Sequence, residues 1–376
     1  MNIIAIAGAR IPSDTANSIQ VMKVCQALAQ LGHQVTLIVP ALPTVLNPPA
    51  PDLQTLYGLH TPFDIEYLPA MGAAGRRLFT LQAVRRALAL GGDLIYTWFP
   101  QSAVFALLAG KAAIFEIHEP ASTPIGRLWY RLFAALPGKK RLVSITQALV
   151  QILKRDYHIR LKPEDIVIGP NGVELERFAS LPDPQMARRQ IGLPASPAIV
   201  CAGHLYAGRG ASLFLTLAAS TPEAHFVWVG GRPQDVTAWR EKAAGLSNVT
   251  FTGFVPHEQI PLYQAAGDIL LMPYERTIAG SSGGDSSTFC SPMKMFEYMA
   301  AGRAILTSDL PVIREVLDES MAVFCPPEDA PAWQEALYTL LHEPARRQAL
   351  GENARRAAQK YTWLARAKRT LEGFSE

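Results

Sequence analysis

Short apolar runs alternate along the chain with longer segments whose apolar residues recur at helical spacing. The first run covers residues 3–7 and is rich in Ile and Ala. Apolar residues then recur at positions 19, 22, 25 and 28, which marks one face of a helix, and a second run follows at residues 35–39. Further strands are expected at residues 94–97, 113–117 and 142–145. This alternation predicts a parallel sheet with crossover helices.

The same alternation starts again at residue 198. Strands are expected at residues 198–201, 225–229, 249–251 and 269–272, with helices at residues 212–219 and 260–266 between them. Two such arrays, joined near residues 169–181, predict an α/β fold of two facing Rossmann-like domains with parallel sheets. We place the first domain at residues 1–170, the second at residues 171–355, and a C-terminal helix that crosses back to the first domain at residues 356–376.

The composition fits a well-packed α/β protein. Of the 376 residues, 49% are apolar and 18% are charged, which argues against disorder. The formal net charge of +3 gives no support to nucleic-acid binding, which needs a concentrated basic stripe. Basic clusters at residues 76–77, 85–86 and 139–141 are typical of solvated helix faces. Contact with an anionic membrane surface or a phosphate-bearing acceptor is the alternative.

The cysteines and the chain's first residues bear on the compartment. Four cysteines lie far apart, so we expect neither a disulfide framework nor a zinc pattern, and a reducing compartment. Residues 1–8 are typical of a first strand and not of a signal peptide. The uncharged run at residues 94–110 is interrupted by Pro100 and is interpreted as strand, loop and helix. We therefore expect a cytoplasmic protein and leave peripheral contact with the inner membrane face open.

Loops that follow strands are where a doubly wound sheet binds ligands. The first such loop, residues 8–13, lacks the three glycines of a dinucleotide fingerprint, so a nicotinamide enzyme is not expected. The loop at residues 203–210 resembles a phosphate-binding loop but has Arg209 and Gly210 where nucleotide hydrolysis needs lysine and a hydroxyl residue. Its glycines let the backbone approach a ligand, and Arg209 offers a bidentate phosphate contact. Tight strand–helix packing would explain the same glycines.

A polar loop at residues 280–288 leads into a helix that begins after Pro292. The spacing places Lys294 and Glu297 on one face of this helix, where a surface salt bridge is the alternative to a functional role.

Two His-Glu pairs, at His118 and His257, lack the second histidine of a zinc protease motif, so metal hydrolysis is set aside. His118 closes a strand, which suits either an active-site residue or a structural one.

Four segments together resemble glycosyltransferase family 4. They are residues 170–178, 203–210, 248–256, and 291–302 with 308–311. The first half resembles the family more weakly, at residues 18–23, 93–97 and 116–119. The resemblance implies the GT-B fold, in which two Rossmann-like domains enclose a cleft, and metal-independent sugar transfer with retention of configuration. It also implies an acceptor-binding first domain, a nucleotide-sugar-binding second domain, and no cofactor beyond a UDP- or GDP-linked sugar.

The resemblance also assigns residues. Arg209 would bind the donor diphosphate, Glu297 the ribose, and His118 the donor sugar from across the cleft. Further donor-side positions are Gly203, His204, Gly208, Gly210, Phe254, Val255, Ser291, Pro292, Met293 and Lys294. On the acceptor side, the resemblance and the loop after the first strand indicate Arg10, Asn17 and Ser18.

Two departures from the family pattern keep rival functions open. The family usually has glutamate eight residues before the ribose glutamate, but this chain has Phe289, so Ser291 or the loop of Gly283, Gly284 and Asp285 would have to replace that acid. His204 replaces the first basic residue of the diphosphate loop. A nucleotide-sugar epimerase and a non-catalytic nucleotide-sugar or glycan-binding protein are the rivals to a transferase that acts on a glycan, lipid-linked or small-molecule acceptor.

Overall fold

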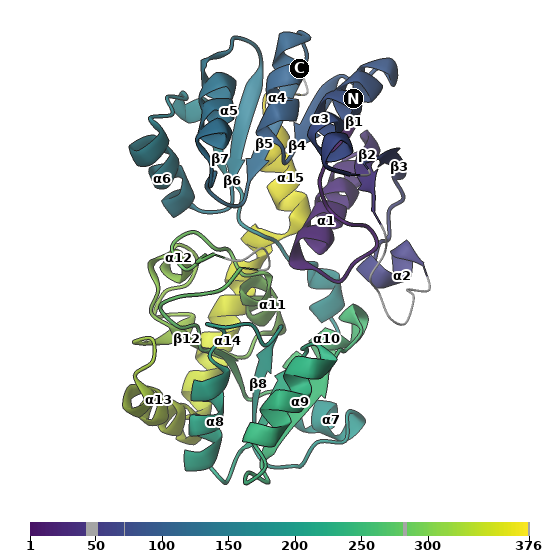
Figure 1. Cartoon of the computed structure of the whole chain (residues 1–376). Coiled ribbons are helices and arrows are strands. Elements are labelled where there is room, and N and C mark those ends of the chain that lie inside the picture. Colours follow the sequence, from purple (N-terminus) through teal and green to yellow (C-terminus); the bar gives the residue numbers. More distant parts are fainter. Residues whose placement is uncertain (43–51, 71, 281–283, 375–376) are drawn as a thin grey trace. The chain divides into compact units, whose positions relative to one another are not determined.

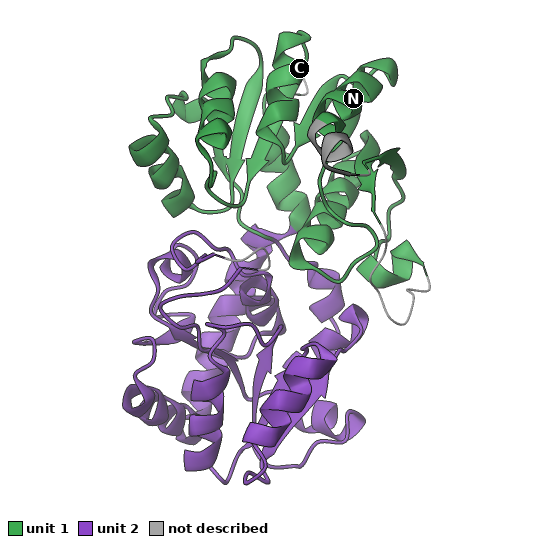
Figure 2. Cartoon of the chain, viewed as in Figure 1, with its two compact units in different colours: residues 1–171, 363–376 green, residues 172–362 purple. Residues whose placement is uncertain are grey.

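The structure, a computed structural model, describes residues 1–42, 52–70, 72–280 and 284–374, with the backbone alone for residues 72–77. The chain divides into two compact units (Figure 2). Unit 1 comprises Met1–Asn171 and Trp363–Glu376, and unit 2 comprises Gly172–Thr362.

Unit 1 is built on a parallel sheet of seven strands in the order β3-β2-β1-β4-β5-β6-β7 (Figure 1). The strands are β1 Asn2–Ile6, β2 Gln34–Ala41, β3 Asp64–Pro69, β4 Leu94–Thr97, β5 Ala112–Ile117, β6 Lys140–Ser144 and β7 Ile166–Ile168. The helices are α1 Ala16–Gln30, α2 Leu53–Tyr57, α3 Gly72–Ala89, α4 Pro100–Leu108, α5 Pro124–Ala135, α6 Gln147–Tyr157 and α15 Trp363–Leu371, with a 3₁₀ turn at Pro163–Asp165. The central strands β1 and β4 are buried almost throughout, which explains their continuous apolar sequence.

Unit 2 repeats this plan with a parallel sheet of six strands in the order β10-β9-β8-β11-β12-β13. The strands are β8 Ala198–Ala202, β9 His225–Val229, β10 Val249–Gly253, β11 Ile269–Met272, β12 Ala304–Ser308 and β13 Ala322–Cys325. The α-helices are α7 Pro184–Gln190, α8 Ala211–Ser220, α9 Pro233–Lys242, α10 Ile260–Ala266, α11 Met293–Ala301, α12 Pro311–Arg314, α13 Ala330–His342 and α14 Pro344–Ala358. The 3₁₀ turns are Leu175–Phe178, His257–Gln259 and Gln359–Tyr361. The prediction of two parallel-sheet α/β domains is confirmed.

Local chemistry explains where the helices that carry candidate site residues begin and end. The Thr15 side chain accepts a hydrogen bond from the Ser18 N–H and caps α1, and Thr146 caps α6 in the same way. Helix α11 begins after Pro292 and ends at Gly302, whose φ of +66° lies in the left-handed region that favours glycine.

Each sheet also has a point where the strand order reverses. It lies between β1 and β4 in unit 1 and between β8 and β11 in unit 2. Ligands of open α/β sheets bind beyond the carboxyl ends of the strands at such a point. In unit 2, a ligand site is therefore expected at the loops after β8 and β11.

Candidate functional site

The glycine-rich loop at residues 203–210 connects the buried strand β8 to α8. Gly208 and Gly210 have φ values of +80° and +81°. A Cβ atom would lie 2.0 Å from the Thr277 carbonyl oxygen at the first position and 1.8 Å from that of Pro273 at the second. Close packing against the segment after β11 thus accounts for both glycines. The same packing holds Arg209, which lies between them, against that segment.

Two cations lie beside the ring of Tyr274, which follows β11 and is almost fully buried. Arg209 Nη1 donates a hydrogen bond of 3.0 Å to the Tyr274 hydroxyl, and its Cζ lies 5.1 Å from the ring centroid. Lys294 Nζ, from α11, lies 4.7 Å from the same centroid and 3.8 Å from Cys201 Sγ. The fold thus gathers two positive charges at the carboxyl edge of the sheet.

Neither of these cations forms an ion pair with any residue that the structure describes. The surface salt bridge between Lys294 and Glu297, the alternative considered from the sequence, is therefore not formed. Two like charges without a counter-ion repel each other, and an anion that contacts both relieves the repulsion. The arrangement suits a ligand with two adjacent anionic groups.

At the start of α8, the Gly210 N–H already donates a hydrogen bond to a carboxyl group of the chain, that of Glu275. Burial raises the pKa of the Glu275 carboxyl, the Glu328 charge adds to the rise, and a hydrogen bond from the Gly210 N–H partly offsets it. Anion binding at this edge therefore depends on the Arg209 and Lys294 side chains more than on the helix N-terminus.

Glu297 lies on α11 and is largely buried, with a side-chain exposure of 14%. Its Oε2 accepts a hydrogen bond of 3.1 Å from Gln264 Nε2, and its Oε1 lies 3.5 Å from His257 Nε2. Burial alone would raise the pKa of Glu297, but the His257 hydrogen bond and charge and the charge of Arg177 lower it below its ordinary value. Glu297 is thus a carboxylate at neutral pH.

Other donor-side positions differ in exposure. Phe254 is exposed, Val255 is buried at the edge of β10, Ser291 and Pro292 are buried, and Met293 is half-buried. His204 stacks on Tyr206, with ring centroids 5.0 Å apart.

Asp285 supplies the carboxylate of the loop that was one of the two candidates to replace the family's missing acid, and it is bonded to its own loop. Its carboxylate accepts hydrogen bonds of 2.9 Å from the Ile278 N–H, the Ser287 N–H and the Ser287 hydroxyl. These bonds lower the pKa of Asp285 although burial acts to raise it. The carboxylate therefore stabilises the loop around Phe289. Residues 281–283 of the same glycine-serine stretch lie outside the described residues.

In unit 1, His118 follows the carboxyl end of β5 and is partly exposed. Its Nε2 lies 2.7 Å from Glu116 Oε1, a carboxylate with no exposed surface near the carboxyl end of the apolar strand β5. Burial would raise the pKa of Glu116, but the charge of Arg366 and the contact with His118 bring it down to about 2. Sequence inspection missed this pair, although a glutamate inside an apolar strand is the signal that could have found it.

The acceptor-side predictions fall on the loop before α1 and on its first turn. The Ser18 hydroxyl is fully buried and is bonded to Ser13 and Thr15, so it holds the loop and is closed to a ligand. Asn17 is exposed and Arg10 is half-buried.

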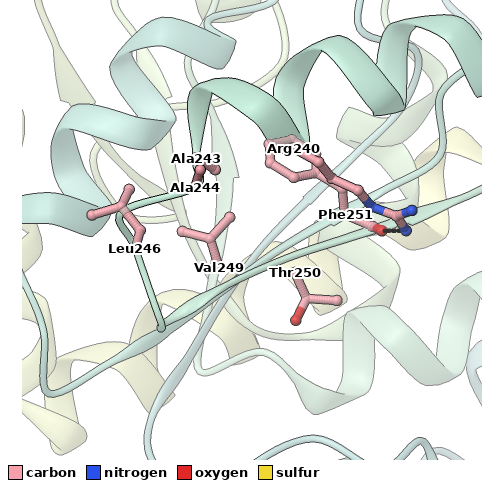
Figure 3. Close-up of a pocket in the computed structure, with 7 residues that line it drawn as sticks. All are labelled: Arg240, Ala243, Ala244, Leu246, Val249, Thr250 and Phe251. Atoms are coloured by element: carbon pink, nitrogen blue, oxygen red, sulfur yellow. Dashed lines mark hydrogen bonds between the residues drawn. The ribbon is translucent and has the colours of Figure 1, made fainter.

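A pocket lies in unit 2 at the end of α9 and the start of β10, and Figure 3 shows its lining. Arg240 Nη2 donates a hydrogen bond of 2.6 Å to the Phe251 carbonyl oxygen there. Since α9 runs back along the sheet, the pocket lies toward the amino ends of the strands, away from Arg209. Its lining is Arg240, Ala243, Ala244, Leu246, Val249, Thr250 and Phe251.

Two negative findings concern the described residues. They contain no group of three or more His, Cys, Asp or Glu side chains arranged to hold a metal ion. None of their helices combines the length and the apolar composition that a membrane crossing requires.

The two Rossmann-like units match solved structures of the GT-B fold. Sucrose-phosphate synthase from Thermosynechococcus elongatus matches with a TM-score of 0.74 at 19% identity, over 100% of this chain and 98% of that one. Anabaena HepE in complex with UDP matches with a TM-score of 0.74 at 16% identity, over 100% of both chains, and HepE is also known in complex with UDP-glucose.

Sequence comparison points to glycosyltransferases. The family model Glycosyltransferase Family 4 matches residues 18–177, and the model Glycosyl transferases group 1 matches residues 196–343. Phosphatidyl-myo-inositol mannosyltransferase of Mycolicibacterium smegmatis is 26% identical over 360 residues, which cover 91% of this chain and 85% of the relative. The chain is a glycosyltransferase of the GT-B fold, and its first half is similar to glycosyltransferase family 4.

Proposed function

We propose that this glycosyltransferase moves a sugar from a UDP- or GDP-linked donor to a hydroxyl group of a glycan, lipid-linked or small-molecule acceptor. Transfer proceeds with retention of the anomeric configuration and needs no metal ion or further cofactor. The observation that carries the proposal is the pair of cations, Arg209 and Lys294, beside one buried tyrosine ring and without a carboxylate partner among the described residues.

In this proposal the two cations bind the donor diphosphate and stabilise the charge that develops on the leaving group. Glu297 accepts hydrogen bonds from the vicinal hydroxyls of the ribose. An ionised carboxylate has about four acceptor positions. Gln264 occupies one of them and His257 lies close to a second, so acceptor positions remain for the ribose.

The chemical step exchanges one bond at the anomeric carbon for another. The bond to the diphosphate oxygen breaks while the bond to the acceptor oxygen forms on the same face of the sugar. The acceptor proton passes to the leaving phosphate oxygen, and the products are a glycoside and a nucleoside diphosphate. His118 binds a hydroxyl of the donor sugar, and exclusion of water from the site limits hydrolysis of the donor.

The relatives support these classes of donor and acceptor. HepE binds UDP and UDP-glucose, and the Mycolicibacterium smegmatis relative is named for transfer of mannose to a phosphatidylinositol lipid. A lipid-linked acceptor would bring the enzyme to the cytoplasmic face of the membrane, where we propose peripheral contact.

The test is release of nucleoside diphosphate from a panel of UDP- and GDP-sugars, each with and without a mixture of glycan, lipid and small polyol acceptors. A transferase releases nucleoside diphosphate at a rate that depends on the acceptor. An epimerase would convert the donor without any acceptor. Binding of nucleotide sugars without turnover would favour the non-catalytic rival and contradict the proposal.

A further inference from the structure

A buried polar cluster lies behind His118 in unit 1. At its centre, Glu116 Oε1 accepts hydrogen bonds from Gln20 Nε2 at 2.5 Å and from Arg366 Nη2 at 2.6 Å, and it lies 2.7 Å from His118 Nε2. The Tyr96 hydroxyl donates to the other carboxylate oxygen. The partners come from α1, α15, the residue after β5, and β4, so one carboxylate connects four separate parts of unit 1.

The cluster holds both members of the ion pair between Arg366 and Glu116 in place. Arg366 Nε donates to the Gly169 and Pro170 carbonyl oxygens at 3.1 Å and 3.0 Å, and Arg366 Nη1 lies 3.4 Å from the Tyr96 hydroxyl. Side-chain exposure is 2% for Arg366 and 0% for Glu116. Because two charges lose their hydration here, well-packed apolar residues would give comparable stability. A buried pair of this kind is therefore better explained by what it orients than by what it stabilises.

His118 is where the cluster reaches solvent. Its side chain is 27% exposed, whereas Gln20, Glu116, Arg366 and Tyr96 are all nearly inaccessible. Its other ring nitrogen, Nδ1, makes no hydrogen bond to any residue in the described part of the chain. The cluster thus ends in one partly exposed imidazole that has a free nitrogen.

The chemistry of the carboxylate decides which ring nitrogen carries the proton. An ionised carboxylate can only accept hydrogen bonds, so His118 Nε2 must donate. In a neutral imidazole the other nitrogen is then an acceptor. His118 can therefore accept a hydrogen bond from a hydroxyl group through Nδ1, and the Glu116 contact keeps its ring from rotating.

We propose that Glu116 and Arg366 are positioning residues: they hold His118 with Nε2–H directed inward and Nδ1 free to accept a hydrogen bond from a sugar hydroxyl. This inference deepens the proposed function, on which the identity of the hydroxyl rests. The orientation and tautomer of His118 do not depend on that function.

The first experiment is a double-mutant cycle on the full chain. Glu116→Leu combined with Arg366→Met removes both charges together, so that neither is left buried alone. His118→Ala is made in the parent and in this paired variant, with Glu164→Gln, an exposed glutamate of the same unit, as the control. Turnover is measured below the thermal unfolding midpoint of every variant.

If Glu116 and Arg366 act through His118, their effects on kcat are not additive. His118→Ala should lower kcat tenfold or more in the parent but less than threefold in the paired variant. The same factor in both backgrounds, or no effect in the parent, would overturn the proposal.

The second experiment needs neither a stable variant nor activity. Two-bond ¹H–¹⁵N correlation of the parent, at a pH where its imidazoles are neutral, reports the tautomer of His118, and His118→Ala assigns the signals. A proton on Nε2 with a lone pair on Nδ1 supports the proposal, and a proton on Nδ1 or a mixture of tautomers overturns it. If the parent turns over no donor, the proposed function fails, but this spectrum still decides the positioning role.

Discussion

The cations beside Tyr274 give a quantitative prediction for nucleotide binding. Since Arg209 Cζ and Lys294 Nζ lie 5.1 Å and 4.7 Å from one ring centroid, the two charges are no more than about 10 Å apart. At that separation and an effective dielectric constant of about 20, their repulsion is about 1.7 kcal/mol or more. A diphosphate that contacts both replaces repulsion by attraction, and each charged hydrogen bond contributes about 1.5–3 kcal/mol. Arg209→Ala or Lys294→Ala should therefore weaken UDP or GDP binding by about 10- to 150-fold.

Titration calorimetry at physiological ionic strength, where the screening length is about 8 Å, measures this loss. The matched control is Lys242→Ala, because Lys242 Nζ lies 4.0 Å from the Trp239 ring centroid at the end of α9, away from the carboxyl edge of the sheet. It should leave the affinity within about twofold, well under the 1.4 kcal/mol of a tenfold change. Unchanged affinity in both Arg209→Ala and Lys294→Ala would refute the assignment of a diphosphate site to this edge.

Glu297→Gln should weaken donor binding about tenfold or more, because the amide keeps only part of the hydrogen bonding and loses its charge-assisted strength. Phe289→Leu should lower turnover less than Glu297→Gln does, since an aromatic ring cannot supply a carboxylate's contacts with hydroxyls; the reverse order would show that the ribose role is misplaced. Excess chelator should leave nucleoside diphosphate release within about a factor of two, well under the tenfold that corresponds to about 1.4 kcal/mol, and a collapse that manganese restores would contradict metal independence. Acid should destabilise unit 1 through Glu116, whose pKa is about 2 in the folded chain against an ordinary 4.5. The folded chain takes up this proton at lower pH than the unfolded chain, so the stabilisation is full above about pH 5 and is lost between about pH 4.5 and pH 2. This stabilisation is on the order of 3 kcal/mol. Denaturant titrations across this pH range should show a steeper loss of the free energy of unfolding in the parent than in the paired variant Glu116→Leu with Arg366→Met. Equal slopes would contradict the pKa shift of Glu116.

The apolar pattern predicted most of the central strands but only one of the four edge strands of the two described sheets. Expected strands at residues 198–201, 225–229, 249–251 and 269–272 correspond to β8 to β11. The edge strands β3, β7 and β13 were not predicted, and neither was the fully buried β12, whereas the edge strand β10 was. An edge strand is covered less than a central one, so it carries a weaker apolar signal. β3 shows this, since it includes Asp64 and Glu66 and buries none of its residues fully.

Side-chain partners could not be predicted at all from spacing. Lys294 and Glu297 lie three residues apart on α11, yet Lys294 contacts Tyr274 whereas Glu297 contacts Gln264 and His257. Partners of this kind depend on which strands are neighbours, and a local period carries no information about strand order. The pair of Glu116 and Arg366, 250 positions apart in the chain, is the extreme case.

The two departures from the family pattern have unequal consequences in the structure. His204 stands where the family has a basic residue, but Lys294 places a second cation on the Tyr274 ring beside Arg209. Positive charge for a diphosphate is thus retained, supplied from α11 in place of the glycine-rich loop. Phe289 is different, because Asp285 is already bonded to its own loop. Asp285 is thus committed to its loop while Arg209 and Lys294 remain beside Tyr274, so we expect the substitution at 289 to change the choice of donor sugar more than nucleotide binding.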